Sequence, residues 1–375
     1  HLLSRRQRQM CIRDSLSTLI LFGSTTQASG TSGADSLTYF DAVRFPVIGK
    51  IYPDSLPFFS RIPYFLKPTT RKAVWNLGQN AAGIAVRFRS DSPVIAVKWE
   101  NTFNNSMKHM APVGIKGLDL YCFIDGKWRF VNSAQPSGKT NQWQIISGMD
   151  ATEREYMLYL PLYDGIHSLQ IGVAAPSHIG QPSLPYPDTR KPIVFYGSSI
   201  TQGACASRPG MAATNLIGRK LNVETINLGF SGNAFIDYEV AEMMAHVDAS
   251  AYVLDYVPNA SPEQILEKTE KFVRILREKH PDVPLIFVED PIFPHSKFDL
   301  RMAKEIKDKN DAMNQAFSSL KKQGLKKIYL VKGRSLISAN GESTVDGIHF
   351  TDCGFEQYVD AILPILKKAI NHKKK

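Results

Sequence analysis

The segment IVFYGSSITQG at residues 193–203 decides how the second half of this chain folds. It opens with a short apolar run that ends at Gly197 and continues into a polar stretch, which is typical of a buried strand followed by a turn. Four later segments repeat this order of an apolar run followed by polar or glycine-containing residues: VETINLGFSG (223–232), AYVLDYVPN (251–259), PLIFVEDP (284–291) and KKIYLVKG (326–333).

Helical stretches lie between these strand candidates. They include SPEQILEKTEKFVRILREKH (261–280) and RMAKEIKDKNDAMNQAFSSLKKQG (301–324). The first has a clear start, because the Ser261 hydroxyl can cap the helix and Pro262 costs nothing in the first turn. Strands that alternate with helices predict an α/β domain, in which helices cover both faces of a parallel sheet. In such sheets the working site lies at the carboxyl ends of the strands.

The first half of the chain has a different pattern. It contains runs rich in Val, Ile, Tyr and Phe that Gly, Pro, Asn and Asp interrupt: AAGIAVRFRS (81–90), PVIAVKWE (93–100), LDLYCFIDGKWRFV (118–131) and EYMLYLPLYDGIHSLQIGVA (155–174). This predicts a β-sandwich of jelly-roll type. The proline-rich stretch that follows reads as a linker. We therefore expect four parts. They are an N-terminal segment that looks like a cloning or sequence-assembly scar followed by a signal peptide (1–37), a β-sandwich domain (38–183), a linker (184–192) and an α/β domain (193–375).

The charge balance is basic, with a formal net charge of +10 over 375 residues. Part of it comes from the first 28 residues, which hold Arg5, Arg6, Arg8 and Arg13 against Asp14, and a lysine cluster ends the chain. No aromatic residues interleave with those lysines, so we expect no nucleic-acid partner.

The N-terminal segment also bears on location. Basic residues, then the short apolar run LSTLILFG, then small residues near Ala28 are the order of a secretory signal, too short to span a bilayer. We expect a secreted or periplasmic protein without stable membrane insertion.

Polar residues end several of the predicted strands and so should share one crevice. Ser198 and Ser199 follow the first strand, Gly232 the second and Asn259 the third; a last such segment, DGIH (346–349), precedes an amphipathic helix. These segments can supply a serine, neutral hydrogen-bond donors and an Asp/His pair.

The set resembles the SGNH (GDSL-type) hydrolase superfamily, whose blocks carry Ser, Gly, Asn and Asp-x-x-His in this order. YGSSITQG resembles the nucleophile block, with Ser198 where Asp is usual, and VPN replaces the more usual Gly-x-Asn-Asp. GLDLY (117–121) resembles the Gly-x-Asp-Leu-Tyr motif of a β-domain that precedes one bacterial branch of these enzymes. The resemblance covers nearly all of the chain after about residue 40.

The resemblance implies a serine hydrolase with Ser199 as nucleophile, His349 as general base and Asp346 as its partner. The N–H groups of Ser199 and Gly232 and the side-chain amide of Asn259 would form the oxyanion hole. Ser198 is the alternative nucleophile, although a hydrogen bond within the turn suits it better. A phosphate-binding reading of GSSITQG is weak, because no Gly-Lys-Ser/Thr ending follows.

Two further residues are candidate substrate contacts: His109, in a methionine-bearing loop of the first domain, and Arg208, soon after the nucleophile block. Cys205 and Cys353 should both lie near the crevice, and a disulfide between them stays open. Cys122 reads as a small core residue. No residues show metal-ligand spacing, so we expect neither a metal nor a cofactor.

The resemblance therefore implies a serine esterase that acts through an acyl-serine intermediate. In enzymes that look like this one, a β-domain attached to the hydrolase often accompanies action on O-acetylated carbohydrates, so we expect a carbohydrate O-acetyl esterase. Two alternatives stay open: a lipase-like or thioesterase acylhydrolase for longer acyl chains, and a non-catalytic carbohydrate-binding protein.

The tetrapeptide DGIH occurs twice, at 164–167 and 346–349. Around the first copy, an Asp-Gly pair between two strand runs predicts a hairpin. There His167 shares parity with Leu169 and Ile171, so it should be partly packed. The second copy is the expected acid-base pair.

Overall fold

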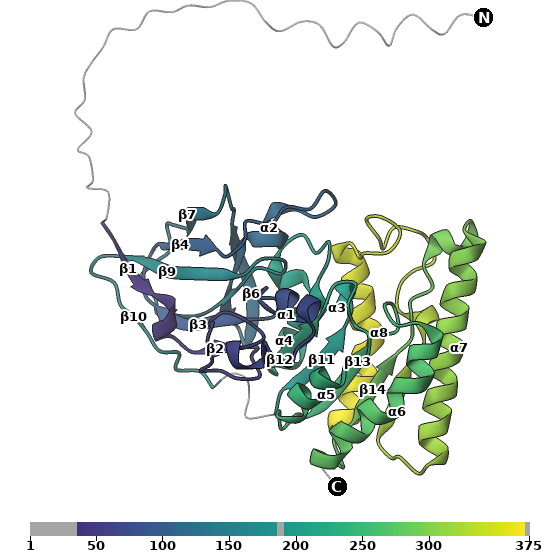
Figure 1. Cartoon of the computed structure of the whole chain (residues 1–375). Coiled ribbons are helices and arrows are strands. Elements are labelled where there is room, and N and C mark those ends of the chain that lie inside the picture. The colour runs from purple at the N-terminus through teal and green to yellow at the C-terminus, as the bar shows by residue number, and fades with distance from the viewer. Residues whose placement is uncertain (1–35, 186–190, 372–375) are drawn as a thin grey trace, which may run out of the picture. The chain divides into compact units, whose positions relative to one another are not determined.

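The computed structural model describes residues 36–185 and 191–371. The signal-like segment and the middle of the expected linker lie outside the described residues. From residue 37 on, the described residues form one compact unit. Its first half is β-rich and its second half contains a parallel sheet flanked by helices, which confirms the fold class expected from the sequence (Figure 1).

Two antiparallel sheets make up the β-rich half. The four-stranded sheet has the order β1 (Leu37–Asp41), β9 (Ile166–Ala174), β4 (Ile95–Asn101) and β7 (Thr140–Ile146). The six-stranded sheet has the order β10 (Ile179–Gly180), β3 (Ala85–Ser90), β8 (Arg154–Tyr159), β5 (Leu118–Ile124) and β6 (Lys127–Ala134), with β2 (Val47–Ile48) paired to β3. Side chains from both sheets, such as Phe88 and Trp99, share one buried core, as in a sandwich.

The α/β half is built on a five-stranded parallel sheet. Its order is β12 (Thr225–Gly229), β11 (Ile193–Gly197), β13 (Ala251–Asp255), β14 (Leu285–Val288) and β15 (Ile328–Val331). The chain therefore adds strands first on one side of β11 and then on the other. A crevice forms at such a reversal, here at the carboxyl ends of β11 and β13.

Helices cover both faces of this sheet (Figure 1). Alternate residues of β11 enter different cores: Val194 and Tyr196 join one cluster, and Ile193 and Phe195 join the other. The helices of this half are α3 (Ser199–Gln202), α4 (Ala213–Leu221), α5 (Tyr238–Ala245), α6 (Pro262–Lys279), α7 (Leu300–Lys322) and α8 (Asp352–Asn371). Helix α6 begins as expected, because the Ser261 hydroxyl accepts from Gln264 N and the Gln264 side chain accepts from Ser261 N.

Shorter helices lie in the connections. The β-rich half contains α1 (Lys72–Gly78) and α2 (Pro112–Lys116). Single turns of 3-10 helix occur at Ala42–Arg44, Tyr64–Leu66, Pro209–Met211, Pro294–Lys297 and Gly333–Ser335.

Buried ionic groups join the two halves. The Asp119 carboxylate, fully buried, accepts hydrogen bonds from Arg208 Nη1 and Gly210 N, both at 2.8 Å, and from the Ser133 hydroxyl. Arg208 also donates to the Tyr121 hydroxyl at 2.6 Å. Asp119 and Tyr121 are the Asp and Tyr of GLDLY, so this motif holds the segment that follows the first helix of the α/β half.

A second connection runs through Arg61. Its guanidinium donates to the carbonyl oxygens of Asn227 and Gly229, in β12, and to those of Leu77 and Asn80 in its own half. Burial lowers the pKa of Arg61 to about 9. These four carbonyl oxygens take the place of water around the buried guanidinium. Because two of them come from each half, the contact forms only when the two halves pack in this arrangement.

The prediction of a hairpin at the first DGIH copy is wrong. Strand β8 pairs with β3 and β5 in the six-stranded sheet, whereas β9 pairs with β1 and β4 in the other sheet. Asp164 and Gly165 therefore lie where the chain crosses between sheets. The alternating runs on either side were read correctly as strands, but their pattern does not specify which sheet each strand joins.

The expected partial packing of His167 is also wrong, because His167 is exposed while Leu169 and Ile171 are buried. The register of β9 against β4 shifts here: Ser168 pairs with Glu100, and Ile166 pairs with Asn101. This bulge rotates the start of the strand, so side-chain parity is not kept through it.

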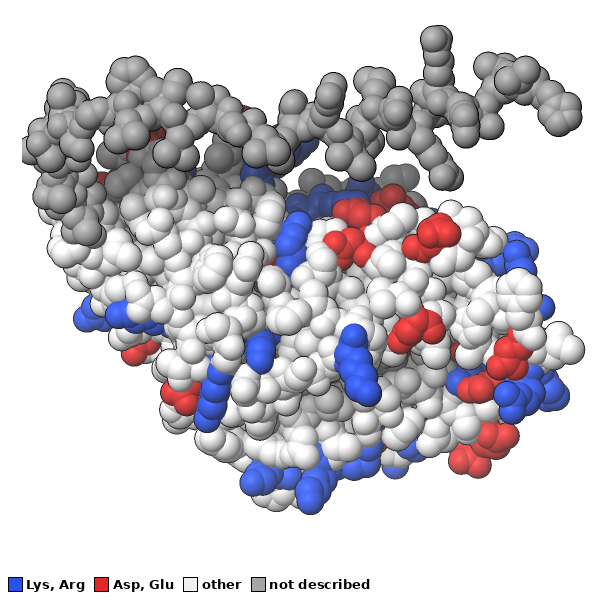
Figure 2. Space-filling view, turned by 90° about the horizontal axis from the view of Figure 1, so that it is seen from above, with Lys and Arg blue, Asp and Glu red and all other residues white. Residues whose placement is uncertain are grey.

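The described surface carries charges of both signs. On the face in Figure 2, Lys and Arg side chains are separated by neutral surface, and Asp and Glu side chains lie among them. Among the described residues, no helix is long and apolar enough to cross a membrane.

A buried acid beneath the sheet edge gives a test of the fold. The Asp255 carboxyl, at the end of β13, accepts from the hydroxyls of Thr201 and Tyr358 at 2.8 and 2.7 Å. Burial raises its pKa from 3.8 to about 7. The folded protein therefore keeps on Asp255 a proton that the unfolded chain releases near pH 4. The stability that the protonated carboxyl group contributes is fully present below pH 4 and is lost as the pH rises towards 7.

We predict that Asp255→Asn, which cannot ionise, makes stability less sensitive to pH. Between about pH 5 and about pH 8, the unfolding free energy of the variant should fall by on the order of 2 kcal/mol less than that of the unmodified protein. Denaturant unfolding at both pH values measures this difference. Equal pH dependence in the two proteins would contradict the assignment.

Candidate active site

Ser199 is held in a tight turn at the end of β11. A Cβ on Gly197 would lie 2.1 Å from Thr201 Oγ1 and 2.7 Å from the Asp255 carbonyl oxygen, so only glycine fits there. Ser198 caps the short helix α3, and its hydroxyl accepts from Ile200 N at 3.2 Å. The Ser198 side chain is thus used within the turn, and Ser199 is the serine that faces the crevice.

The two ring nitrogens of His349 link Ser199 to Asp346 by hydrogen bonds. His349 Nε2 is 3.0 Å from Ser199 Oγ, and His349 Nδ1 is 2.7 Å from Asp346 Oδ2. Because a carboxylate only accepts, Nδ1 carries the proton of a neutral ring and Nε2 accepts from the serine hydroxyl. The sequence-predicted triad is therefore assembled, although 150 positions separate the serine and the histidine.

The Asp346 carboxylate is further fixed by its own loop. Its Oδ1 accepts from the backbone N–H groups of Ile348 and His349 at 3.1 and 2.8 Å. Burial raises the pKa of Asp346, but hydrogen bonds from the His349 side chain and from these two backbone groups outweigh burial and lower it to about 2. The carboxylate is therefore ionised at neutral pH and can stabilise an imidazolium.

Gly232 and Asn259 lie at the same crevice. The Asn259 Oδ1 accepts from Ala234 N at 3.2 Å, which leaves the amide NH₂ as the donor end of this side chain. Gly232 has a φ of +65°, in the left-handed region that favours glycine. The Gln202 side chain holds this loop, because its Oε1 accepts from Ser231 N at 3.0 Å. The structure thus brings together the expected oxyanion donors.

One cavity of about 420 Å³ contains these groups. Its catalytic side is formed by Ser199, His349, Gly232 and Asn259. Apart from Ser231, the other lining residues are apolar or charged: Ile200, Pro258, Phe293, Met302, Ile306 and Ile348, together with Asp290, Glu305 and Lys309. Sequence reasoning missed Asp290 and Lys309. The signal for Asp290 was its place directly after a predicted strand, shared with Ser199 and Asn259.

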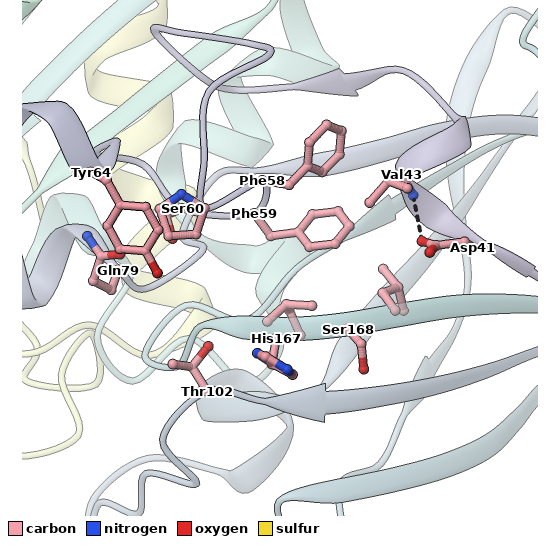
Figure 3. Close-up of a pocket in the computed structure, with 13 residues that line it drawn as sticks. Asp41, Val43, Phe58, Phe59, Ser60, Tyr64, Gln79, Thr102, His167 and Ser168 are labelled. Atoms are coloured by element: carbon pink, nitrogen blue, oxygen red, sulfur yellow. Dashed lines mark hydrogen bonds between the residues drawn. The ribbon is translucent and has the colours of Figure 1, made fainter.

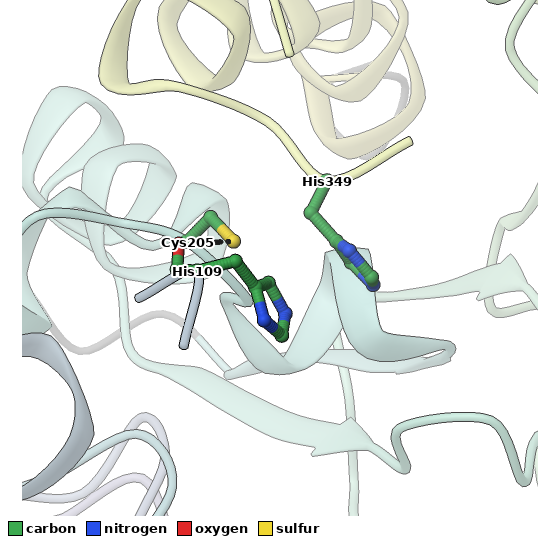
Figure 4. A group of neighbouring side chains, drawn as sticks. All are labelled: His109, Cys205 and His349. Carbon is green, nitrogen blue, oxygen red and sulfur yellow. Dashed lines mark hydrogen bonds between the residues drawn. The ribbon is translucent and has the colours of Figure 1, made fainter. Parts of the chain in front are cut away.

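His109 reaches the site from the β-rich half. Its ring centroid is 5.4 Å from that of His349, and its carbonyl oxygen accepts from the Cys205 thiol at 3.3 Å (Figure 4). The structure thus places this candidate substrate contact beside His349.

The loop that carries His109 is anchored by the first DGIH copy. The buried Asp164 carboxylate accepts from the backbone N–H groups of Phe103 and Asn105 at 2.9 and 2.7 Å. Sequence reasoning treated Asp164 as a turn residue and missed this role, because its partners lie about 60 positions earlier in the chain.

His109, Cys205 and His349 could together offer ligands to a metal ion, since their ligand atoms lie within 4.8 Å of one another. Burial, and secondarily Asp346, raise the pKa of the Cys205 thiol to about 12. A metal ion would have to displace that proton and take a ring nitrogen of His349 that is hydrogen-bonded to Ser199 or to Asp346, so it would compete with these two contacts.

Arg208, the other candidate substrate contact, points elsewhere. Its guanidinium binds Asp119 and Tyr121 and lies 3.8 Å from the Phe130 ring centroid. It is not among the residues that line the catalytic cavity. The structure gives it a part in joining the two halves.

The disulfide that the sequence left open is not formed. Cys122, Cys205 and Cys353, the three cysteines that the structure describes, are free thiols. Cys205 is buried and bonded to the His109 loop, whereas Cys353 is exposed on α8.

His167 lies at a different cavity, of about 210 Å³, in the β-rich half (Figure 3). Phe58, Tyr64, Gln79 and Thr102 also line it, and Ser199 does not. The two DGIH histidines therefore belong to separate places in the molecule.

A parallel sheet with its strand order reversed beside β11, and a Ser/His/Asp relay at that point, define a serine ester hydrolase of SGNH type. Comparison with known families agrees. Residues 190–367 match the GDSL-like lipase/acylhydrolase family, and residues 37–179 match the GxDLY N-terminus of SGNH-type esterases. A solved structure described as a GDSL-like lipase from Bacteroides ovatus is 38% identical, covers 90% of this chain and 98% of its own, and superimposes with a TM-score of 0.86. The chain therefore belongs to the GDSL-like lipase/acylhydrolase family.

More distant solved structures share the fold alone. A salicylyl-acyltransferase from a tetracycline biosynthetic pathway has a TM-score of 0.71 at 17% identity, with 88% of this chain and 97% of that chain covered. A family two carbohydrate esterase from Cellvibrio japonicus has a TM-score of 0.60 at 12% identity, with 90% and 99% covered. The comparison with curated proteins found no match.

Proposed function

We propose that this protein is a carbohydrate O-acetyl esterase that works through an acetyl-serine intermediate. The observation that carries the proposal is the cavity at Ser199, which combines an apolar wall with the carboxylates of Asp290 and Glu305 and the ammonium of Lys309. A sugar ring presents apolar C–H faces and polar hydroxyls, and so matches both kinds of lining.

The reaction follows from the relay. Ser199 Oγ attacks the ester carbonyl carbon while His349 Nε2 takes the hydroxyl proton, and the Asp346 carboxylate stabilises the resulting imidazolium. Collapse of the tetrahedral intermediate breaks the bond to the alcohol oxygen, which receives the proton from His349. Water then repeats the sequence on the acyl-serine, releases acetate and restores the serine.

The developing oxyanion needs donors that are already in place. We assign this role to the N–H groups of Ser199 and Gly232 and to the amide of Asn259, which converge on the same cavity. Neutral donors suit the role, because they stabilise negative charge without competing for the catalytic proton.

Polar groups in the cavity argue against a long acyl chain as its occupant. Asp290 is 3% exposed and Lys309 is 8% exposed, and an alkyl chain beside them would offer no hydrogen bonds. The apolar wall, which includes Phe293 and Ile306, is the observation that favours the alternative of a lipase-like acylhydrolase. Acyl-chain preference separates the two.

We expect kcat/KM on p-nitrophenyl esters to be highest for acetate and to fall by about 10-fold or more by octanoate, because a longer acyl chain must share the one cavity at Ser199 with the alcohol part and so lie beside its polar groups. Release of p-nitrophenol along an acetate, butyrate, hexanoate and octanoate series measures this, with Ser199→Ala as the inactive control. Activity that rises beyond butyrate would favour the lipase-like alternative.

The two DGIH copies offer a matched pair of variants. We expect His349→Ala to lower kcat by at least about 10⁴-fold, because the serine loses its base. The same change at the exposed His167 should leave kcat within about twofold, because it lies at another cavity. Steady-state kinetics on p-nitrophenyl acetate decides, and comparable losses in both variants would refute the assignment of the base.

For the oxyanion hole, we expect Asn259→Ala to lower kcat by about 10²-fold to 10³-fold, with little change in KM, because the amide acts mainly on the transition state. Ser198→Ala is a suitable control, since its hydroxyl is used in the turn. A rise in KM with kcat unchanged would assign Asn259 to ground-state binding.

A further inference from the structure

Asp290 is a buried carboxyl group in the catalytic cavity that the relay does not use. It lies two residues beyond the end of β14, is 3% exposed, and lines the cavity together with Ser199 and His349. Its Oδ1 is buried without a hydrogen-bond partner among the described residues. Burying a polar atom in this way is costly, so the site calls for a partner that the protein itself does not supply.

Backbone contacts set the position of Asp290 in the fold. Asp290 is fixed through its backbone, because its N–H donates to Asn310 Oδ1 at 2.7 Å and its carbonyl accepts from Asn310 Nδ2 at 3.0 Å. Both contacts are independent of the side chain. The segment is therefore held rigidly while its carboxyl group is left free to meet a ligand.

Lys309 determines what kind of ligand fits. Its ammonium donates to the Pro258 carbonyl at 3.1 Å and pairs with Glu305 at 2.5 Å, so it is held at the cavity beside the loop that carries Asn259. A cationic substrate group would be repelled by this ammonium. A hydroxyl group can donate to a carboxyl oxygen and accept from an ammonium, and so it suits both residues.

We propose that Asp290 is a specificity residue that accepts a hydrogen bond from a hydroxyl group on the alcohol part of the substrate. The inference rests on the proposed function, because the acetyl group has no hydroxyl and the sugar must provide it. Burial raises the pKa of Asp290 to about 7 against the opposing effect of Lys309. Either protonation state of the carboxyl group can accept from a hydroxyl.

Apolar lining residues supply the second part of recognition. Phe293, Ile306 and Met302 line the same cavity and can contact the apolar face of a ring. Recognition of a cyclic polyol therefore divides between an apolar face and the Asp290 carboxyl. An acetylated ring without hydroxyl groups would make only the apolar contact.

The test compares substrates that differ in hydroxyl groups. The substrates are monoacetylated methyl glycosides of xylose, glucose and mannose, with cyclohexyl acetate as a ring alcohol without hydroxyls and p-nitrophenyl acetate as a reporter of chemistry. We expect Asp290→Ala to lower kcat/KM on the best glycoside by about 10-fold to 100-fold, mainly through KM, and Asp290→Asn, which keeps an accepting oxygen, to lower it less; both should leave the other two acetates within about threefold.

Asp311→Asn is the matched control, because Asp311 is an exposed carboxylate on α7 that pairs with Lys307 and does not line the cavity. It should change all three kinds of substrate by less than about threefold. Thermal unfolding of each variant checks that the fold is kept, and p-nitrophenyl acetate gives a second check on the relay.

Each outcome separates the inference from the proposed function. Loss confined to glycosides supports the inference. Equal loss on all substrates, or no loss on glycosides, overturns it while the esterase assignment stands. Turnover of p-nitrophenyl acetate but of no glycoside by the unmodified enzyme would overturn the carbohydrate proposal and this inference with it.

Discussion

The arrangement of this protein depends on the buried carboxylate of Asp119. It binds the Arg208 guanidinium and Gly210 N, and so fixes the segment that leaves the nucleophile turn against the β-rich half. A carboxylate removed from water requires such partners, because an unpaired buried charge is strongly destabilising. The same segment holds Cys205, which binds the His109 loop, and Ser207, which binds Asp352 just after the second DGIH copy. One buried ionic contact thus aligns three parts of the chain that meet at Ser199.

This arrangement explains why a β-domain precedes the hydrolase sheet in this chain. The β-rich half contributes His109 to the catalytic crevice, and Asp164 holds the loop that brings it there. The α/β half contributes the relay and the charged wall of the cavity. In the proposed function, the strand ends of the parallel sheet provide the reacting groups, and the loops around them contribute to substrate recognition.

Much of the fold and of the catalytic relay could be predicted from the sequence. Parallel strands must all present their carboxyl ends at one edge, so Ser199, Gly232 and Asn259 were expected to meet once the strands were recognised. Asp346 and His349 are three residues apart and share a loop, which fixes their relative position locally. The capped start of α6 was equally local, since Ser261 and Gln264 belong to one turn.

What the sequence by itself determined are features set by neighbouring residues: the strands, the helices, and the polar segments at the strand ends. Only the tertiary structure decided which distant groups pair. It placed Arg208 against Asp119 rather than in the cavity, sent β8 and β9 into different sheets, and left the Asp290 carboxyl facing the substrate cavity. The physical reason is that the order of apolar and polar residues along the chain indicates which segments form strands and helices. The residue that a buried polar group contacts depends instead on how the separate cores pack together.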